Sequence, residues 1–213
     1  CKPVFGMNMK MITPAEMPRF LAIYADDLDA AGHNNSPGYG FSVARDYDSW
    51  KAKMTKVMVS MDEGLGGLID AIKAPGVFEE TAIILTADHG MTPYWGPSSL
   101  QDLIKTVEAL GYKCEFLGKG GRARKDTDVV LVSAGLSVQF YFRNEITKAQ
   151  YDKVVSAVAS QPYVGGHFTQ DELREAGAHP SLGSLLIWPE PPNHFHTSGK
   201  LLGLGGQHDS AED

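Results

Sequence analysis

Two short apolar runs in the first half of the chain have the composition of buried strands. Residues 19–25 read Arg-Phe-Leu-Ala-Ile-Tyr-Ala, and residues 81–87 read Thr-Ala-Ile-Ile-Leu-Thr-Ala. Runs of this length, rich in branched and aromatic residues, are typical of strands. The second run is the clearest buried-strand signal in the sequence.

Helical periodicity lies between these runs and after them. Apolar residues recur at three- and four-residue steps from about residue 42 to residue 73, and Pro75-Gly76 ends that pattern. The polar stretch 26–40 is predicted to be a loop. The same criteria, together with capping residues, predict three further helices over residues 98–110, 147–160 and 169–176.

The second half of the chain also contains strand signals, at residues 129–133, 136–142 and 184–188. Strands that alternate with helices are typical of α/β proteins with a largely parallel sheet. We therefore predict an α/β fold with a mostly parallel central sheet flanked by helices. The chain is expected to form one domain over residues 1–213, with residues 112–192 as a candidate subdomain.

Composition narrows the class of partner. The 213 residues are 43% hydrophobic and 21% charged, as in ordinary globular proteins. The net charge of −7 argues against a nucleic acid polymer as the main partner, since such a partner calls for a basic face. No run approaches the roughly 18 apolar residues of a membrane span, so no membrane segment is predicted. The oligomeric state stays open.

Three motifs place candidate metal ligands beside glycine, two with a carboxylate and an imidazole and one with an imidazole alone. Asp88-His89-Gly90 follows the run at 81–87, and Asp29-Ala-Ala-Gly-His33 follows the run at 19–25. Gly205-Gly-Gln-His208 lies near the C-terminus. Ligands in open α/β sheets bind beyond the carboxyl ends of strands, where the first two motifs are expected to lie. Asp and His are ligands of divalent metal ions, so we predict a metal centre.

The number of candidate ligands favours two metals over one. A single tetrahedral site that keeps one position open uses three protein ligands. Two neighbouring metals, as in enzymes of phosphoryl transfer, use more. A set of nitrogen and oxygen donors without thiolate suits zinc or manganese. The candidate ligands are Asp29, His33, Asp88, His89 and His208.

Two other segments have weaker claims to a function. His194 and His196 flank Phe195, and a metal or substrate role competes there with two exposed loop histidines, which we favour. Residues 118–125 are glycine-rich and basic. They lack the Gly-Lys-Ser/Thr ending of a phosphate-binding loop and are predicted to form a flexible surface loop.

The three metal motifs resemble those of type I phosphodiesterases/nucleotide pyrophosphatases, in the alkaline phosphatase superfamily. The matching strings are Tyr24-x-x-x-x-Asp29-x-x-Gly32-His33, Thr86-Ala-Asp88-His89-Gly90-Met91 and Gly206-x-His208, and the resemblance spans residues 19–208. It implies an alkaline phosphatase-like fold with two zinc ions, manganese being the alternative. Asp29, His33 and His208 would bind one ion, and Asp88 and His89 the other.

The resemblance also implies groups that this sequence does not offer. The family uses a further Asp and a Thr or Ser nucleophile, both upstream of the Tyr24 motif. Asp209 stands where the last motif usually has glycine. We therefore expect the chain to be the C-terminal portion of a longer enzyme and to be nearly inactive by itself, because a covalent phosphoryl intermediate needs that hydroxyl.

The implied activity is hydrolysis of phosphodiester or pyrophosphate bonds in a small phosphorylated substrate. Alternatives are a phosphoglycerate mutase-like isomerase, a sulfatase or phosphonate hydrolase of the same superfamily, and a non-catalytic metal-binding fragment. The resemblance favours a location outside the cytoplasm, although no residue of the chain decides it. The identity of the substrate does not follow from the fold.

Overall fold

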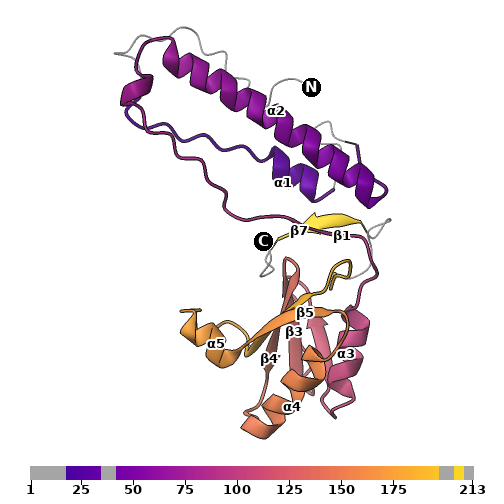
Figure 1. The fold of residues 1–213 in the computed structure, drawn as a ribbon. Coiled ribbons are helices and arrows are strands. Elements are labelled where there is room, and N and C mark those ends of the chain that lie inside the picture. Colours follow the sequence, from indigo (N-terminus) through magenta and orange to yellow (C-terminus); the bar gives the residue numbers. More distant parts are fainter. Residues whose placement is uncertain (1–17, 35–41, 197–203, 209–213) are drawn as a thin grey trace. The chain divides into compact units, whose positions relative to one another are not determined.

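The computed structural model describes residues 18–34, 42–196 and 204–208. The chain divides into two compact units, unit 1 over residues 1–88 and unit 2 over residues 89–213 (Figure 1). Each unit has its own secondary structure. The prediction of one domain with a subdomain at 112–192 stays a prediction.

Unit 1 is built on two helices, α1 (Asp27–Gly32) and α2 (Tyr47–Lys73), followed by the short 3₁₀ helix η3 (Phe78–Glu80). The helix predicted from the apolar periodicity is α2, which begins later than expected. It begins at a capping box, in which the Asp46 carboxylate accepts the backbone N–H of Ser49 at 2.7 Å. Gly76, with φ of +80°, lies where the predicted end falls.

The two apolar runs of unit 1 were predicted to be strands, the second of them buried, and this prediction is wrong. Among the described residues, neither 19–25 nor 81–87 forms a strand. Their side chains are exposed, as the 85% exposure of Phe20 and the 88% exposure of Ile84 show. A strand needs a neighbouring strand to satisfy its backbone groups, and no described segment pairs with either run. The composition of a segment indicates that it can form a strand, but it does not indicate whether another strand lies beside it.

The predicted loop at 26–40 also needs correction. Its first part contains α1, a helix of six residues. The polar composition concealed this helix, because only Ala31 and Gly32 in it are buried and no apolar period marks its face. Residues 35–41 lie outside the described part of the chain.

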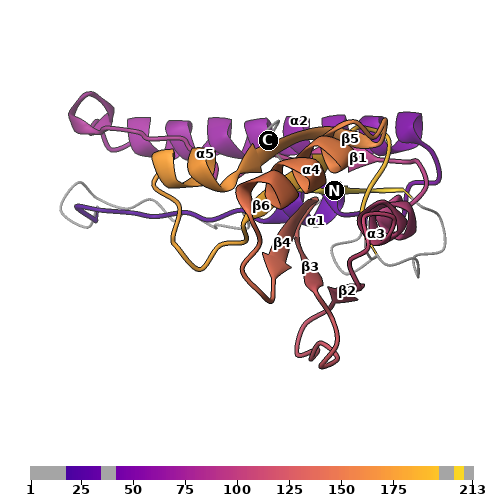
Figure 2. The ribbon, with the colours of Figure 1, turned by 90° about the horizontal axis from the view of Figure 1, so that it is seen from below.

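Unit 2 contains a five-stranded sheet with the strand order β2-β3-β4-β6-β5. Only β2 and β3 are parallel, and the other neighbours are antiparallel. Figure 2 shows β2, β3 and β4 side by side. The strands are β2 (Cys114–Leu117), β3 (Val129–Ala134), β4 (Ser137–Phe142), β5 (Val164–Thr169) and β6 (Leu185–Pro189).

The α/β fold class is confirmed, but the sheet is mostly antiparallel rather than parallel. The tight connection between β3 and β4 explains one antiparallel pair, because Gly135 adopts a φ of +55° and reverses the chain within a turn. A parallel pair would need a longer crossover, such as the one from β2 to β3.

Three helices of unit 2 follow the predicted ranges, α3 (Leu100–Glu108), α4 (Lys148–Ala159) and α5 (Gln170–Glu175). Helices α3 and α4 cover one face of the sheet (Figure 1). Alternate residues of each central strand point to that face, as the period of a strand requires. The buried core there contains Leu103, Val107, Val129, Leu131, Val138, Phe140, Val154, Val158, Leu185 and Ile187.

A second, two-stranded ribbon pairs β1 (Thr92–Tyr94) with β7 (Gly205–Gln207), antiparallel. These strands are far apart in the sequence, and neither was predicted. Within the described ranges, no helix is both long and apolar enough to cross a membrane.

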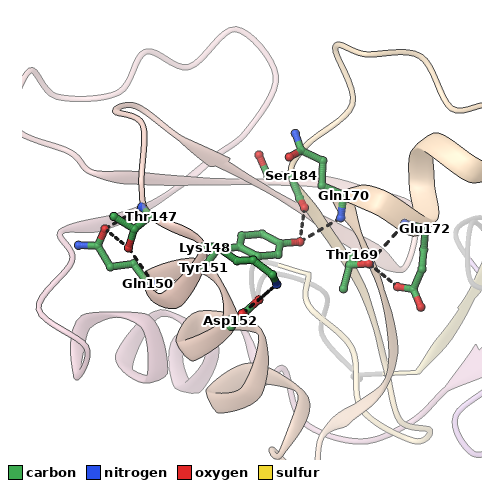
Figure 3. Close-up of polar contacts among 9 residues, drawn as sticks. All are labelled: Thr147, Lys148, Gln150, Tyr151, Asp152, Thr169, Gln170, Glu172 and Ser184. Atoms are coloured by element: carbon green, nitrogen blue, oxygen red, sulfur yellow. Dashed lines mark hydrogen bonds and ion pairs between the residues drawn. The ribbon is translucent and has the colours of Figure 1, made fainter.

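Tyr151 of α4 ties together three segments of unit 2 (Figure 3). Its hydroxyl donates to the carbonyl oxygen of Ser184 at 2.7 Å, just before β6. The same oxygen accepts the backbone N–H of Gln170 at 3.0 Å, where α5 begins. Both α4 and α5 start with capping boxes, at Thr147 and Thr169 respectively. The phenol of α4 therefore links the start of α5 to the residue before β6.

We expect Tyr151→Phe to lower the free energy of unfolding by about 1 kcal/mol, because both hydrogen bonds are lost while the ring stays. Urea denaturation measures the change. Tyr112→Phe is the control, since the hydroxyl of Tyr112 has no hydrogen-bond partner in the part of the chain that the structure describes. Equal midpoints for both variants would contradict the role given to Tyr151.

Candidate metal centre

Unit 1 places two of the predicted ligands face to face. Asp29 lies in α1 and His33 is its C-cap residue, so the two side chains project from the same side of one helical turn. The distance from His33 Nε2 to Asp29 Oδ1 is 3.1 Å. Two ligands bound tetrahedrally at zinc distances lie ~3.4 Å apart. The pair therefore needs only a small adjustment to share a metal ion.

The surroundings of this pair are acidic. Asp26 and Asp27 precede Asp29, and burial together with the neighbouring Asp26 raises the pKa of the Asp27 carboxyl. Carboxylates this close disfavour one another's charge, and a bound cation relieves that repulsion. The electrostatics of α1 therefore favour a positive ion.

Asn34, the residue after His33, connects α1 to α2 and to the segment before it. The Asn34 side chain donates to the carbonyl oxygen of Ala44 at 2.9 Å, accepts the Ala44 N–H at 2.8 Å, and accepts from Lys53 Nζ at 2.7 Å. The indole of Trp50 donates to the carbonyl oxygen of Gly32 at 2.8 Å. No motif in the sequence marked these residues. The only signal was an Asn directly after the helix, where a left-handed residue is common.

Asp88 and His89 lie at the boundary of the two units, in chain without regular secondary structure. Asp88, which ends unit 1, is exposed. His89 begins unit 2, and its Nδ1 donates to the carbonyl oxygen of Gly90 at 2.9 Å. This bond fixes the tautomer, so that Nε2 carries the lone pair, which is the usual arrangement of a metal-binding histidine.

The β1–β7 ribbon brings His208 to His89. Thr92 pairs with Gln207. His89 lies three residues before Thr92 and His208 directly follows Gln207, and their rings stack with centroids 3.8 Å apart and planes 20° apart. The His208 carbonyl oxygen accepts the N–H of Leu136 at 2.8 Å, which anchors the end of β7. The sequence motifs assigned these histidines to different metals. Ligands of metals roughly 3.5–4 Å apart lie close together, so the contact is compatible with that assignment.

Gly205 permits this ribbon to form. A Cβ at that position would lie 2.6 Å from Oη of Tyr94, closer than real side chains approach. The Tyr94 ring in turn packs on His194, with centroids 4.7 Å apart. Glycine in the last motif is therefore required for packing, whereas the histidine of that motif is the candidate ligand.

His194 is buried, and its prediction as an exposed loop histidine is wrong. It is 6% exposed, and burial lowers the pKa of its imidazole, so the ring is neutral near pH 7. Nδ1 accepts the backbone N–H of His196 at 3.1 Å, which places the proton of the neutral ring on Nε2. That tautomer offers no lone pair to a metal. His194 supports the ribbon and α3, since its carbonyl oxygen accepts the N–H of Ser99 at 2.8 Å.

The basic segment 118–125 is largely exposed, as predicted for a surface loop. It joins β2 to β3 and is followed by no helix, so it lacks the strand-to-helix setting of a phosphate loop. Glu115 of β2 closes the loop by accepting from the Arg124 N–H at 2.9 Å and the Thr127 hydroxyl at 2.6 Å.

The family model of type I phosphodiesterase / nucleotide pyrophosphatase matches residues 4–210. The chain belongs to this family. The motifs that carried the resemblance, around Asp29, Asp88 and His208, all lie within the matched residues. The prediction of the family is confirmed.

Relatives of the chain include proteins of animals and yeast. Bis(5'-adenosyl)-triphosphatase ENPP4 of Bos taurus is 33% identical over 73 residues, which cover 34% of this chain and 14% of that protein. Ectonucleotide pyrophosphatase/phosphodiesterase 1 of Saccharomyces cerevisiae is 23% identical over 184 residues, or 85% of this chain and 22% of that protein. The chain thus spans less than a quarter of the length of these relatives.

Proposed function

We propose that this chain carries metal ligands of a hydrolase that cleaves phosphodiester or pyrophosphate bonds in small nucleotides. The observation that carries the proposal is the 3.1 Å contact between Asp29 and His33. Both residues belong to the Tyr24 motif, and the chain is a member of the family that this motif resembles. A carboxylate oxygen and an imidazole nitrogen at this separation could supply two of the four ligands of a tetrahedral zinc ion.

We assign Asp29, His33 and His208 to one divalent ion, and Asp88 and His89 to the other. The donor set is nitrogen and oxygen, which suits zinc first and manganese second. The Nδ1–H of His89, held by the Gly90 carbonyl, supports its Nε2 as a ligand. Metal ions at such a centre supply positive charge to phosphoryl oxygens and activate an oxygen nucleophile.

The residues of this chain would contribute binding and orientation. The carboxylate of Asp29 and the imidazole of His33 would present two donors from one helical turn, and the bond from His89 Nδ1 to Gly90 would keep its ring from rotating. No nucleophile is assigned among the described residues. The resemblance expects a Thr or Ser hydroxyl for that role.

The names of the relatives and the net charge of the chain support a proposal for the substrate class. The ENPP4 relatives of Bos taurus and Homo sapiens are both named bis(5'-adenosyl)-triphosphatases. We propose a substrate of this chemical kind for the present protein, a small nucleotide with a phosphoanhydride or phosphodiester bond. A net charge of −7 disfavours a nucleic acid polymer in that role.

Metal removal and substrate choice test the function in the protein as it occurs naturally. We expect hydrolysis of bis-p-nitrophenyl phosphate and of a dinucleoside triphosphate, loss of both after chelation, and recovery on adding zinc. Hydrolysis of p-nitrophenyl sulfate in preference to the phosphodiester would identify a sulfatase instead. Tight zinc binding without any hydrolysis would leave a non-catalytic metal-binding protein and would overturn the proposal.

A further inference from the structure

We propose that Asn34 is a positioning residue, which holds helix α1 so that Asp29 and His33 present their donor atoms to one metal ion. The inference rests on the proposed function, because it takes these two side chains as ligands. Asn34 is not itself a ligand, since its amide oxygen and nitrogen are both engaged by other groups. It acts through the backbone next to His33.

The backbone of Asn34 is unusual. Among the described residues, it alone has a positive φ without being glycine, with φ of 55°. Asn tolerates the left-handed conformation better than most residues, for which it costs roughly 1–2 kcal/mol. Its N–H donates to the carbonyl oxygen of Ala31 at 3.2 Å, which closes the last turn of α1. The chain therefore leaves the helix at one fixed angle, directly after His33.

The side chain of Asn34 makes that angle specific. Its amide pairs with the backbone of Ala44 through two bonds, Nδ2 to O at 2.9 Å and N to Oδ1 at 2.8 Å. Lys53 Nζ, which can only donate, adds a third bond to Oδ1 at 2.7 Å and so fixes which side of the amide faces it. Asn34 is only 7% exposed, so water does not replace a missing partner easily.

Helix α2 thus holds His33 on both sides. Before it, Gly32 receives the indole N–H of Trp50 at 2.8 Å, and after it, Asn34 receives Lys53. Trp50 and Lys53 are three residues apart on α2, so they share one face of that helix. Lys53 is half-buried, so this contact is partly shielded from solvent, and the burial lowers the pKa of the ammonium.

The anchors matter because α1 is short. A helix of six residues is not stable by itself, since nucleation costs more than its few hydrogen bonds return. The 3.1 Å separation of Asp29 Oδ1 and His33 Nε2 depends on one intact turn between them. Without Asn34, that turn would open, and the two donors would no longer be presented together. Residues that orient metal ligands typically contribute about 10–100-fold to metal affinity.

Cobalt titration of the 213-residue chain, followed by its visible absorption, tests the proposal. We expect Asn34→Gly and Asn34→Asp each to weaken Co²⁺ binding about 10–100-fold. Asn34→Gly keeps the left-handed backbone and removes only the amide. Asn34→Asp adds a negative charge, which would strengthen cation binding if charge alone mattered. Asn144→Asp, at an exposed loop position, is the matched control and should bind as the unchanged chain does.

A double-mutant cycle with His33→Ala separates positioning from general unfolding. We expect Asn34→Gly to lower affinity no further once His33 is gone, because there is no longer a pair of donors to present together. A further fall of the same size, or equal Co²⁺ affinity of Asn34→Gly and the unchanged chain, would overturn the positioning role while leaving the metal site. If the unchanged chain binds no Co²⁺, the proposed function fails together with this inference. Lys53→Met, which keeps the Asn34–Ala44 bonds, should weaken binding only several-fold.

Discussion

Replacing His33 with Ala is expected to lower the zinc affinity of the chain at least about 100-fold, beyond the effect of residues that only orient ligands. The imidazole nitrogen lies 3.1 Å from Asp29 Oδ1, so its loss leaves the Asp29 carboxylate without its partner in a shared site. A single carboxylate binds zinc weakly, because zinc sites in proteins use three or four protein ligands. Competition with a chromophoric zinc chelator measures the change.

The matched control for this experiment is His179→Ala. His179 is exposed in unit 2, and among the described residues its Nδ1 has hydrogen bonds only with Ser181, to the hydroxyl at 2.7 Å and from the backbone N–H at 3.2 Å. Its removal should leave zinc affinity unchanged. If His33→Ala and His179→Ala bind zinc with the same affinity, α1 is not part of the metal centre, and the family motif at Asp29 has lost its function in this chain.

Phe140→Ala should destabilise unit 2 by about 3–5 kcal/mol, which is a large part of the stability of an ordinary domain. The Phe140 ring is fully buried in β4, between β3 and β6 and beneath the helices that cover the sheet. Truncation removes its burial and leaves a cavity that the surrounding close-packed residues do not refill. Urea denaturation followed by circular dichroism gives the free energy of unfolding.

Phe168→Ala in β5 is the control for Phe140. Phe168 is 38% exposed and packs on Trp188, with ring centroids 5.2 Å apart. We expect it to cost about 1–2 kcal/mol, since part of the ring already contacts water. Comparable losses for the two variants would show that the buried face of this sheet is not the main core of unit 2.

Local signals in the sequence were sufficient for most helices. Thr147 and Gly111 mark a helix start and a helix end by interactions within a few residues, so the structure reproduces them closely. Strands were harder, because a strand is stable only beside another strand. The run at 81–87 lies exposed, whereas β5, which contains Gly165-Gly166, pairs along β6 despite a composition that indicates a turn.

The order of the strands also lay beyond the reach of the sequence pattern. Alternating helices and strands suggested parallel pairing, but β4 pairs with β6, and β6 with β5, in antiparallel fashion. Pairing depends on which segments meet after the chain has turned, and that is a long-range property. The gap between β4 and β6 in the sequence contains two helices and β5, so periodicity carries no information about it.

The sequence by itself determined the family, because its motifs are local strings of residues, and it named candidate ligands that stay predictions. The helical turn that brings Asp29 to His33 lay in a stretch predicted to be a loop, so the structure decided it. Only the tertiary structure decided that His89 stacks on His208, that His194 is buried, and that Asn34 holds α1 on α2. Each of these contacts joins segments whose proximity depends on the folded backbone. The chemistry of a side chain determines what it can bind, and the packing of the folded chain determines its position.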